Sequence, residues 1–131
     1  MSTNRLFTLE EATQLLPTVR QLLIEIRAAK AALDVRTAEL DRLAAMTGGN
    51  GHLAGDMASA RKAIEAAGVE LERLMAELDD LGVELKGIDD GLIDFPTTRE
   101  GRVVYLCWRL GEDEIAWWHD VETGFAGRQP L

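Results

Sequence analysis

The sequence has one cysteine and no excess of basic residues. The first excludes a disulfide within the chain, and the second argues against two classes of partner. One cysteine among 131 residues permits no disulfide within the chain, which is typical of proteins from a reducing compartment. Lysine and arginine number 14 against 23 aspartates and glutamates, so the formal net charge is −9. Binding to nucleic acid or to an anionic membrane requires a basic surface, so this balance argues against both partners.

Long hydrophobic runs are also missing. No segment approaches the ~20 uninterrupted apolar residues of a membrane-spanning helix. The first residues, MSTNRLFTLEEA, lack the apolar run of a signal peptide. We therefore predict a cytoplasmic protein. Apolar residues make up 47% of the chain and charged residues 28%, which suits one soluble domain spanning residues 1–131.

The first part of the chain predicts a long helix over residues 8–46. Thr8 and Glu11 have the spacing of a capping box, in which each side chain bonds to the backbone of the other. Apolar residues then recur in steps of three and four from Leu15 to Leu43, which makes a seam along one side of a helix. Pro17 removes a backbone hydrogen bond, so we expect a kink near it, or a short helix followed by a long one.

A glycine-rich loop over residues 47–55 separates this helix from a second one over residues 56–81. Three glycines at positions 48, 49 and 51 do not sustain a helix. The short loop favours an antiparallel hairpin packed like a coiled coil. The second helix has a heptad seam, formed by Leu53, Met57, Ala60, Ile64, Ala67, Leu71, Leu74, Leu78 and Leu81.

The first helix carries more apolar surface than a two-helix seam needs. The doubled positions Leu15/Leu16 and Leu22/Leu23 widen its apolar face. Either the C-terminal sheet or another hairpin must cover this surplus. Because the sheet should reach only the base of the hairpin, we predict a homodimer through the helices, in a four-helix arrangement.

Residues 83–120 predict a small antiparallel sheet, followed by a tail over residues 121–131. Residues 83–86 alternate apolar and charged, residues 89–91 form a turn, and a short strand over residues 92–95 is stopped by Pro96. Residues 102–110 and 114–120 should pair as a hairpin. The fold class is therefore α+β, a long helical hairpin followed by a small antiparallel sheet.

The turn of that hairpin decides which side chains share a face. A two-residue turn at Gly111-Glu112, or a four-residue loop over residues 111–114, puts Trp117 and His119 on the face of Leu106. This face is nearly all apolar and should pack on the helices. Cys107 then lies on the opposite face, too far from His119 to act with it as nucleophile and base.

Histidine and carboxylates near the sheet form a candidate site for a divalent metal. Imidazole and carboxylates together suit zinc, manganese or iron(II). Between Glu77 and Asp94 seven acids stand against one base, and a cation would offset that repulsion. The candidate ligands are His119, Asp89, Asp90, Asp94 and Glu122.

The second face of the sheet is the candidate surface for a partner. It mixes aromatic and polar side chains, and its candidate contact residues are Tyr105, Arg109 and Trp118. No complete catalytic set is present, so no catalytic residue is predicted. The leading hypothesis is a non-enzymatic interaction or scaffold protein, and the alternative is a divalent-metal or small-molecule site at the sheet.

Both ends of the chain resemble a known family. FTLEEATQLLPTVRQLL at the start, and GLIDFP, VYLCWR, GEDEI, WWH and GFAGR near the end, are similar to the bacterial proteins grouped as domain of unknown function 2203. The family is commonly acidic at position 87 and tyrosine at position 117, where this chain has Gly87 and Trp117. The first departure removes one possible metal ligand. The resemblance implies a bacterial cytosolic protein, and the family has no assigned activity or catalytic residues to carry over.

Overall fold

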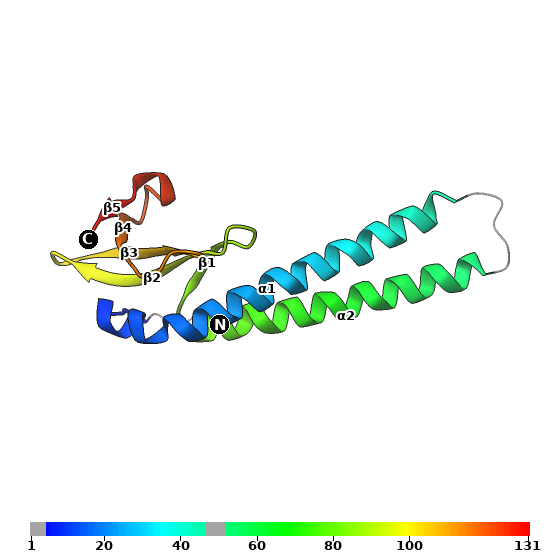
Figure 1. The fold of residues 1–131 in the computed structure, drawn as a ribbon, viewed down its shortest axis with the longest axis horizontal. Coiled ribbons are helices and arrows are strands. Elements are labelled where there is room, and N and C mark those ends of the chain that lie inside the picture. Colours follow the sequence, from blue (N-terminus) through cyan, green and yellow to red (C-terminus); the bar gives the residue numbers. More distant parts are fainter. Residues whose placement is uncertain (1–4, 47–51) are drawn as a thin grey trace.

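A computed structural model describes residues 5–46 and 52–131 of the chain. Helices α1 (Leu9–Ala44) and α2 (Leu53–Asp80) form an antiparallel hairpin, and the sheet lies at one end of it (Figure 1). The predicted α+β fold is confirmed. Of the predicted loop over residues 47–55, Gly48, Gly49 and Gly51 lie outside the described residues, and residues 53–55 are already helical.

Helix α1 begins at the predicted capping box. The Thr8 hydroxyl accepts from the Glu11 backbone N–H at 3.0 Å, and the Glu11 carboxylate accepts from the Thr8 N–H at 2.8 Å. From Leu9 to Ala44 α1 is one helix with Pro17 inside it, so the alternative of two separate helices is wrong. Figure 1 shows its axis changing direction between the first turns (blue) and the long arm.

Five antiparallel strands form the sheet, in the spatial order β1-β2-β3-β4-β5. The turn before β2 needs glycine, because Gly91 has φ of 63° and a Cβ there would lie 2.5 Å from the Cβ of Leu110. The short helix η1 precedes the last strand. The elements are β1 (Glu84–Gly87), β2 (Leu92–Arg99), β3 (Arg102–Arg109), β4 (Trp117–Asp120), η1 (Phe125–Gly127) and β5 (Gln129–Pro130).

Strand β2 runs through Pro96, so the prediction that this proline stops the strand is wrong. The carbonyl of Pro96 accepts a hydrogen bond from the N–H of Phe7 at 2.7 Å, on the side of β2 away from β3. In an antiparallel strand the N–H and C=O of one residue point to the same side. The N–H that proline lacks would therefore have pointed away from β3, so no hydrogen bond between β2 and β3 is lost.

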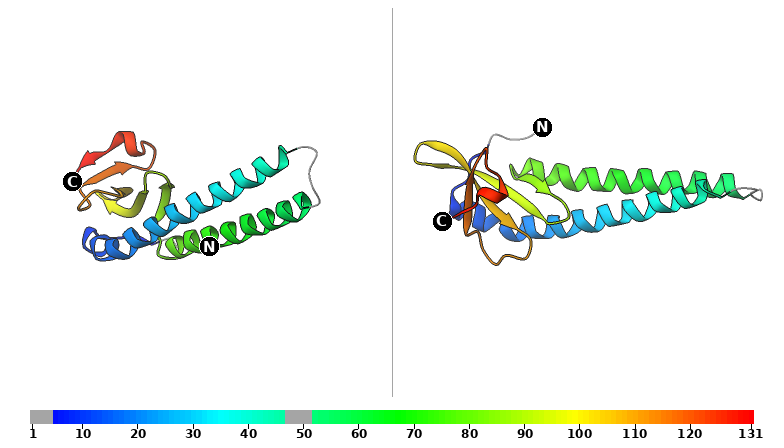
Figure 2. Two further views of the ribbon diagram at one scale, coloured as in Figure 1. Left: turned by 45° about the vertical axis from the view of Figure 1, so that its right-hand side comes forward. Right: turned by 90° about the horizontal axis from the view of Figure 1, so that it is seen from above.

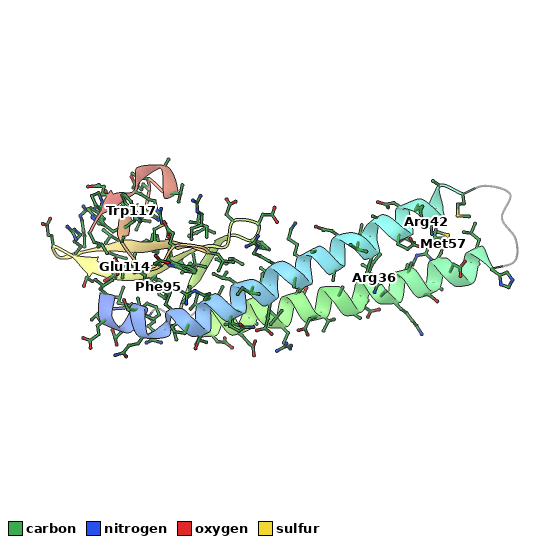
Figure 3. The ribbon with its side chains drawn as sticks, viewed as in Figure 1. Arg36, Arg42, Met57, Phe95, Glu114 and Trp117 are labelled. Atoms are coloured by element: carbon green, nitrogen blue, oxygen red, sulfur yellow. The ribbon has the colours of Figure 1, made fainter. Side chains whose placement is uncertain are left out.

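The core lies between the base of the hairpin and one face of the sheet. Phe95 points from β2 toward α1 (Figure 3) and meets Phe7 edge to face, with ring centroids 5.2 Å apart. The predicted packing of the Leu106 face on the helices is confirmed, since Val104, Leu106 and Trp108 are all buried in this core.

The sheet also covers the apolar surplus of α1. Leu16, Leu22 and Leu23 are buried in the core shared with the sheet, and the half-buried Leu15 packs against it. The expectation that the sheet reaches too little of the hairpin is therefore wrong, because the core extends along α1 as far as Ile26. This reason for a homodimer is removed, and the dimer itself stays a prediction.

The predicted facing of β4 is wrong. Leu106 pairs with Trp118, and Tyr105 pairs with His119. Residues 110–116 form a longer loop than either predicted turn, and its length shifts the register by one residue. A shift of one residue moves every side chain of a strand to the other face. Trp118 therefore joins the core, whereas Trp117 lies on the side of the sheet away from the helices (Figure 3).

Neither helix contains a stretch long and apolar enough to cross a membrane, within residues 5–46 and 52–131.

Candidate metal centre

Three potential metal ligands meet on the face of the sheet that points away from the helices. Asp94 of β2 is paired with Cys107 of β3, and His119 of β4 is paired with Tyr105, two residues before Cys107. Because alternate residues of a strand share a face, Asp94, Cys107 and His119 lie on the same one. The sheet ladder thus brings together residues separated by up to 25 positions.

The three side chains are close together and buried. One ligand atom from each, a carboxylate oxygen, the thiol sulfur and an imidazole nitrogen, lie within 4.8 Å of one another. Asp94 and His119 are each 2% exposed, and Cys107 is fully buried. Within the described residues, Asp94, Cys107 and His119 form the group of three metal-ligating side chains whose ligand atoms are close enough to hold one ion.

The hydrogen bonds of His119 fix which nitrogen faces the other two residues. Its Nδ1 lies 2.7 Å from the carbonyl oxygen of Asp120, and a carbonyl only accepts, so Nδ1 carries a proton and donates. Its Nε2 lies 2.9 and 3.0 Å from the two carboxylate oxygens of Asp94. A histidine that donates one N–H to a backbone carbonyl and presents the other nitrogen is the usual arrangement of a metal-bound histidine.

The electrostatics of the site follow from its burial. Desolvation raises the pKa of the Asp94 carboxyl, and the hydrogen bond and positive charge of His119 oppose that shift. Desolvation, followed by the negative charge of Asp94, raises the pKa of the Cys107 thiol to about 11. At neutral pH Cys107 is therefore a protonated thiol, and it is not an activated nucleophile.

A cavity of about 150 Å³ adjoins two of the three residues. Asp94 and His119 line it, together with the ring of Tyr105 and the side chain of Lys86. The Tyr105 ring lies 5.5 Å from the imidazole, centroid to centroid, and its hydroxyl is 3.2 Å from the Glu84 carboxylate. The rest of the wall is apolar or glycine, formed by Leu92, Val121, Gly124 and Phe125.

The C-terminal segment lies over the same side of the sheet (red in Figure 2). The Arg128 guanidinium bonds both oxygens of Glu112, at 2.6 and 2.9 Å, and donates to the backbone carbonyl of Cys107 at 3.3 Å. It also lies over the ring of Phe125, which lines the cavity. The tail thus covers the site from outside and is held by a partly buried ion pair.

Of the predicted metal ligands, the structure brings together His119 and Asp94. Asp89 is 83% exposed and pairs with Lys30 at 3.3 Å. Asp90 and Glu122 are also exposed, and none of these three belongs to the cluster. Cys107 takes the place that the sequence prediction gave to those acids.

The three predicted partner contacts do not share a face. Tyr105 is half-buried beside His119, and Arg109 is exposed with its guanidinium 5.5 Å from the Phe125 ring. Trp118 is 7% exposed and belongs to the core on the helix side. Its position follows from the register of β4, and only Tyr105 and Arg109 stay on the outer face.

Sequence reasoning missed Cys107 because it placed Cys107 and His119 on opposite faces. The predicted tight turns made that conclusion unavoidable, and only the true length of the 110–116 loop reverses it. One signal was present in the sequence. Asp94 and His119 were both candidates, and a cysteine within a strand between them could have supplied the third ligand of a zinc-type site.

One family model matches the chain, and its description gives no activity. No curated protein and no solved structure matched the chain. The model of one family, described as "Uncharacterized conserved protein (DUF2203)", matches residues 5–131, which include both helices and the whole sheet. The resemblance seen in the sequence is thereby confirmed, and the chain belongs to this family.

Proposed function

We propose that the protein binds a divalent transition metal of the zinc class through Asp94, Cys107 and His119. The observation that carries the proposal is the buried convergence of a thiol, an imidazole and a carboxylate within 4.8 Å. Sulfur and nitrogen ligands favour zinc over magnesium or calcium, which prefer oxygen alone. The compartment that we predict for it is the cytoplasm.

The dimensions of the cluster fit such an ion with small movements. Bonds of ~2.0–2.3 Å at tetrahedral angles place two ligand atoms about 3.3–3.8 Å apart. The Nε2 of His119 and the Asp94 oxygens are already 2.9 and 3.0 Å apart, so these two side chains need to separate by well under 1 Å to admit an ion. The Cys107 thiol must lose its proton on binding, as zinc ligands do.

The test is metal content and its effect on stability. Protein purified without an affinity tag should contain about one zinc per chain or take up one equivalent of Zn²⁺ or Co²⁺. A hundredfold excess of free metal over its dissociation constant should raise the free energy of unfolding by about 2.7 kcal/mol. A chelator should reverse the effect in thermal melts.

A matched pair of histidine variants provides the control. His119→Ala should abolish stoichiometric binding and the effect of the chelator. His52→Ala changes the other histidine of the chain, at the start of α2. It should leave metal binding and the effect of the chelator unchanged. Wild-type protein that takes up no metal and melts identically with and without chelator contradicts the proposal.

A second proposal concerns the part of the helical hairpin that extends beyond the sheet. It keeps the hypothesis of a protein that interacts through its helices. Beyond the sheet the apolar seam between the two helices is buried at Leu43 and Ala60. It is only half-buried within one chain at Leu33, Leu40, Met57 and Ile64. A second copy packed on this seam would complete its burial as a four-helix arrangement. Sedimentation at micromolar concentration should then give twice the chain mass of 14.4 kDa, and a clean monomer removes this proposal.

A further inference from the structure

We propose that the metal bound by Asp94, Cys107 and His119 keeps one coordination position open toward the adjoining cavity, and that this position takes a small carboxylate anion. The inference rests on the proposed metal site. It adds the ligand class that the site would accept, which the protein ligands alone do not specify.

The direction of the open position follows from which ligands line the cavity. Three protein ligands leave a tetrahedral metal with one further position, as in catalytic zinc sites. Asp94 and His119 line the cavity, whereas Cys107 lies outside its wall. A metal held by all three side chains would therefore have Cys107 behind it and the cavity in front. The ladder places these residues on one face, so the remaining position points off the sheet.

The size of the cavity favours a small ligand, and its wall opens to solvent at Val121 and Phe125, which are 53% and 39% exposed. A volume of about 150 Å³ holds a molecule of only a few non-hydrogen atoms, since a water in the liquid takes ~30 Å³. Leu92, Val121 and Phe125 provide apolar contact for a short alkyl group. Acetate and propionate have this size and this combination of a charged head and a small apolar body.

Charge selects an anion over a neutral molecule of the same size. The carboxylate of Asp94 and the thiolate of Cys107 balance the two charges of the metal, so a bound anion needs another cation nearby. Lys86 is the cation among the residues that line the cavity. Its ammonium forms an ion pair with Glu84, with Nζ 2.9 Å from Oε1. This contact uses one of the three N–H donors, which leaves two for a ligand. The Nζ also lies 5.2 Å from the Tyr105 ring, at the wall of the cavity.

The experiment uses the Co²⁺-loaded full chain and follows its visible absorption. Titration with sodium acetate should change the d–d bands in a saturable way, because an oxygen donor enters the first coordination sphere. Acetamide, which has the same shape without the charge, should bind at least about tenfold more weakly. Lys86→Met should weaken acetate binding about tenfold, the usual effect of losing one charge-assisted hydrogen bond. Lys62→Met, an exposed lysine on α2, is the matched control and should bind acetate like the wild type.

The outcomes separate this inference from the proposed function. If Co²⁺ does not bind, the metal site fails, and the open position falls with it. If Co²⁺ binds and acetate leaves the spectrum unchanged, the metal site stands and the open position is overturned. Equal binding of acetate and acetamide, or unchanged acetate binding in Lys86→Met, overturns the selection for an anion.

Discussion

The Nε2 of His119 lies 2.9 and 3.0 Å from the two carboxylate oxygens of Asp94, which stands 25 residues earlier in the chain. Both side chains are 2% exposed. Since Nδ1 donates to the Asp120 carbonyl, one proton between Nε2 and the carboxylate satisfies the pair and keeps it neutral overall. Without a metal the pair thus fills its own hydrogen-bonding needs, and with a metal both groups become ligands.

Two replacements of Asp94 separate its role as hydrogen-bond partner of His119 from its role as proposed metal ligand. Asp94→Asn retains a hydrogen-bond partner for Nε2, so in metal-free protein it should lower the free energy of unfolding less than Asp94→Ala does. The difference should be about 1–3 kcal/mol, because Asp94→Ala leaves a buried imidazole nitrogen unpaired. Both variants should lose the metal. Urea unfolding and metal titration measure the two effects.

The control for these variants is Asp89→Asn. Asp89 forms an exposed pair with Lys30, so its replacement should change stability by less than about 1 kcal/mol and leave metal binding intact. If metal binding survives in Asp94→Asn and disappears in Asp89→Asn, the metal site lies at the turn of Asp89 and Asp90 instead.

Alkaline pH should destabilise the metal-free protein through Cys107. Its thiol pKa is raised to about 11 in the folded chain, above the ~8.5 of an exposed cysteine. The folded state therefore holds the proton more tightly, and this contribution to stability is complete below about pH 8.5 and is lost as pH rises toward 11. The loss should be on the order of 3 kcal/mol, since one pKa unit corresponds to about 1.4 kcal/mol.

Comparison with Cys107→Ser isolates the thiol from the lysines and Tyr105, which also titrate in this range. Urea unfolding under reducing conditions at pH 8 and pH 10.5 gives the slope for each protein. The wild type should lose more stability than the variant across this interval, and equal losses would show that the thiol does not contribute.

The capping box of α1 can be tested at Thr8. Thr8→Ala removes the acceptor for the Glu11 N–H and should lower the free energy of unfolding by about 1 kcal/mol. Thr13→Ala, at an exposed position inside α1, should be neutral or slightly stabilising, because alanine has the higher helix propensity. Chemical denaturation measures both, and equal effects would argue that Thr8 acts only through propensity.

The tail over the metal centre should depend on Arg128. Arg128→Gln breaks the two hydrogen bonds with Glu112. The side chains of this ion pair are 12% and 21% exposed. Hydrogen exchange of the amides in residues 121–131 should accelerate, while exchange in α1 stays the same. Arg102→Gln, which removes a more exposed pair with Asp120, is the comparison and should change exchange less. Uniform acceleration throughout the chain would mean global destabilisation.

The sequence by itself determined the two helices and the strands β1 to β4, but not η1 and β5, which lie in the segment predicted to be a tail. The steps of three and four along α1, the heptads of α2 and the alternation of the strands are local periodicities, and a segment must bury its own apolar stripe whatever it packs against. The capping box of Thr8 and Glu11 is equally local, since both partners lie within one turn. Asp94 and His119 could be named as candidate ligands because their chemistry is evident from residue type.

Only the tertiary structure decided which of these residues meet. The loop over residues 110–116 sets the register of β4, and one residue more or less would send His119 to the core side and Trp118 to the outside. The sheet likewise covers Leu22 and Leu23, which the helical pattern alone assigned to a dimer. Loop length and sheet placement depend on packing between distant segments, so no local pattern encodes the meeting of Asp94, Cys107 and His119.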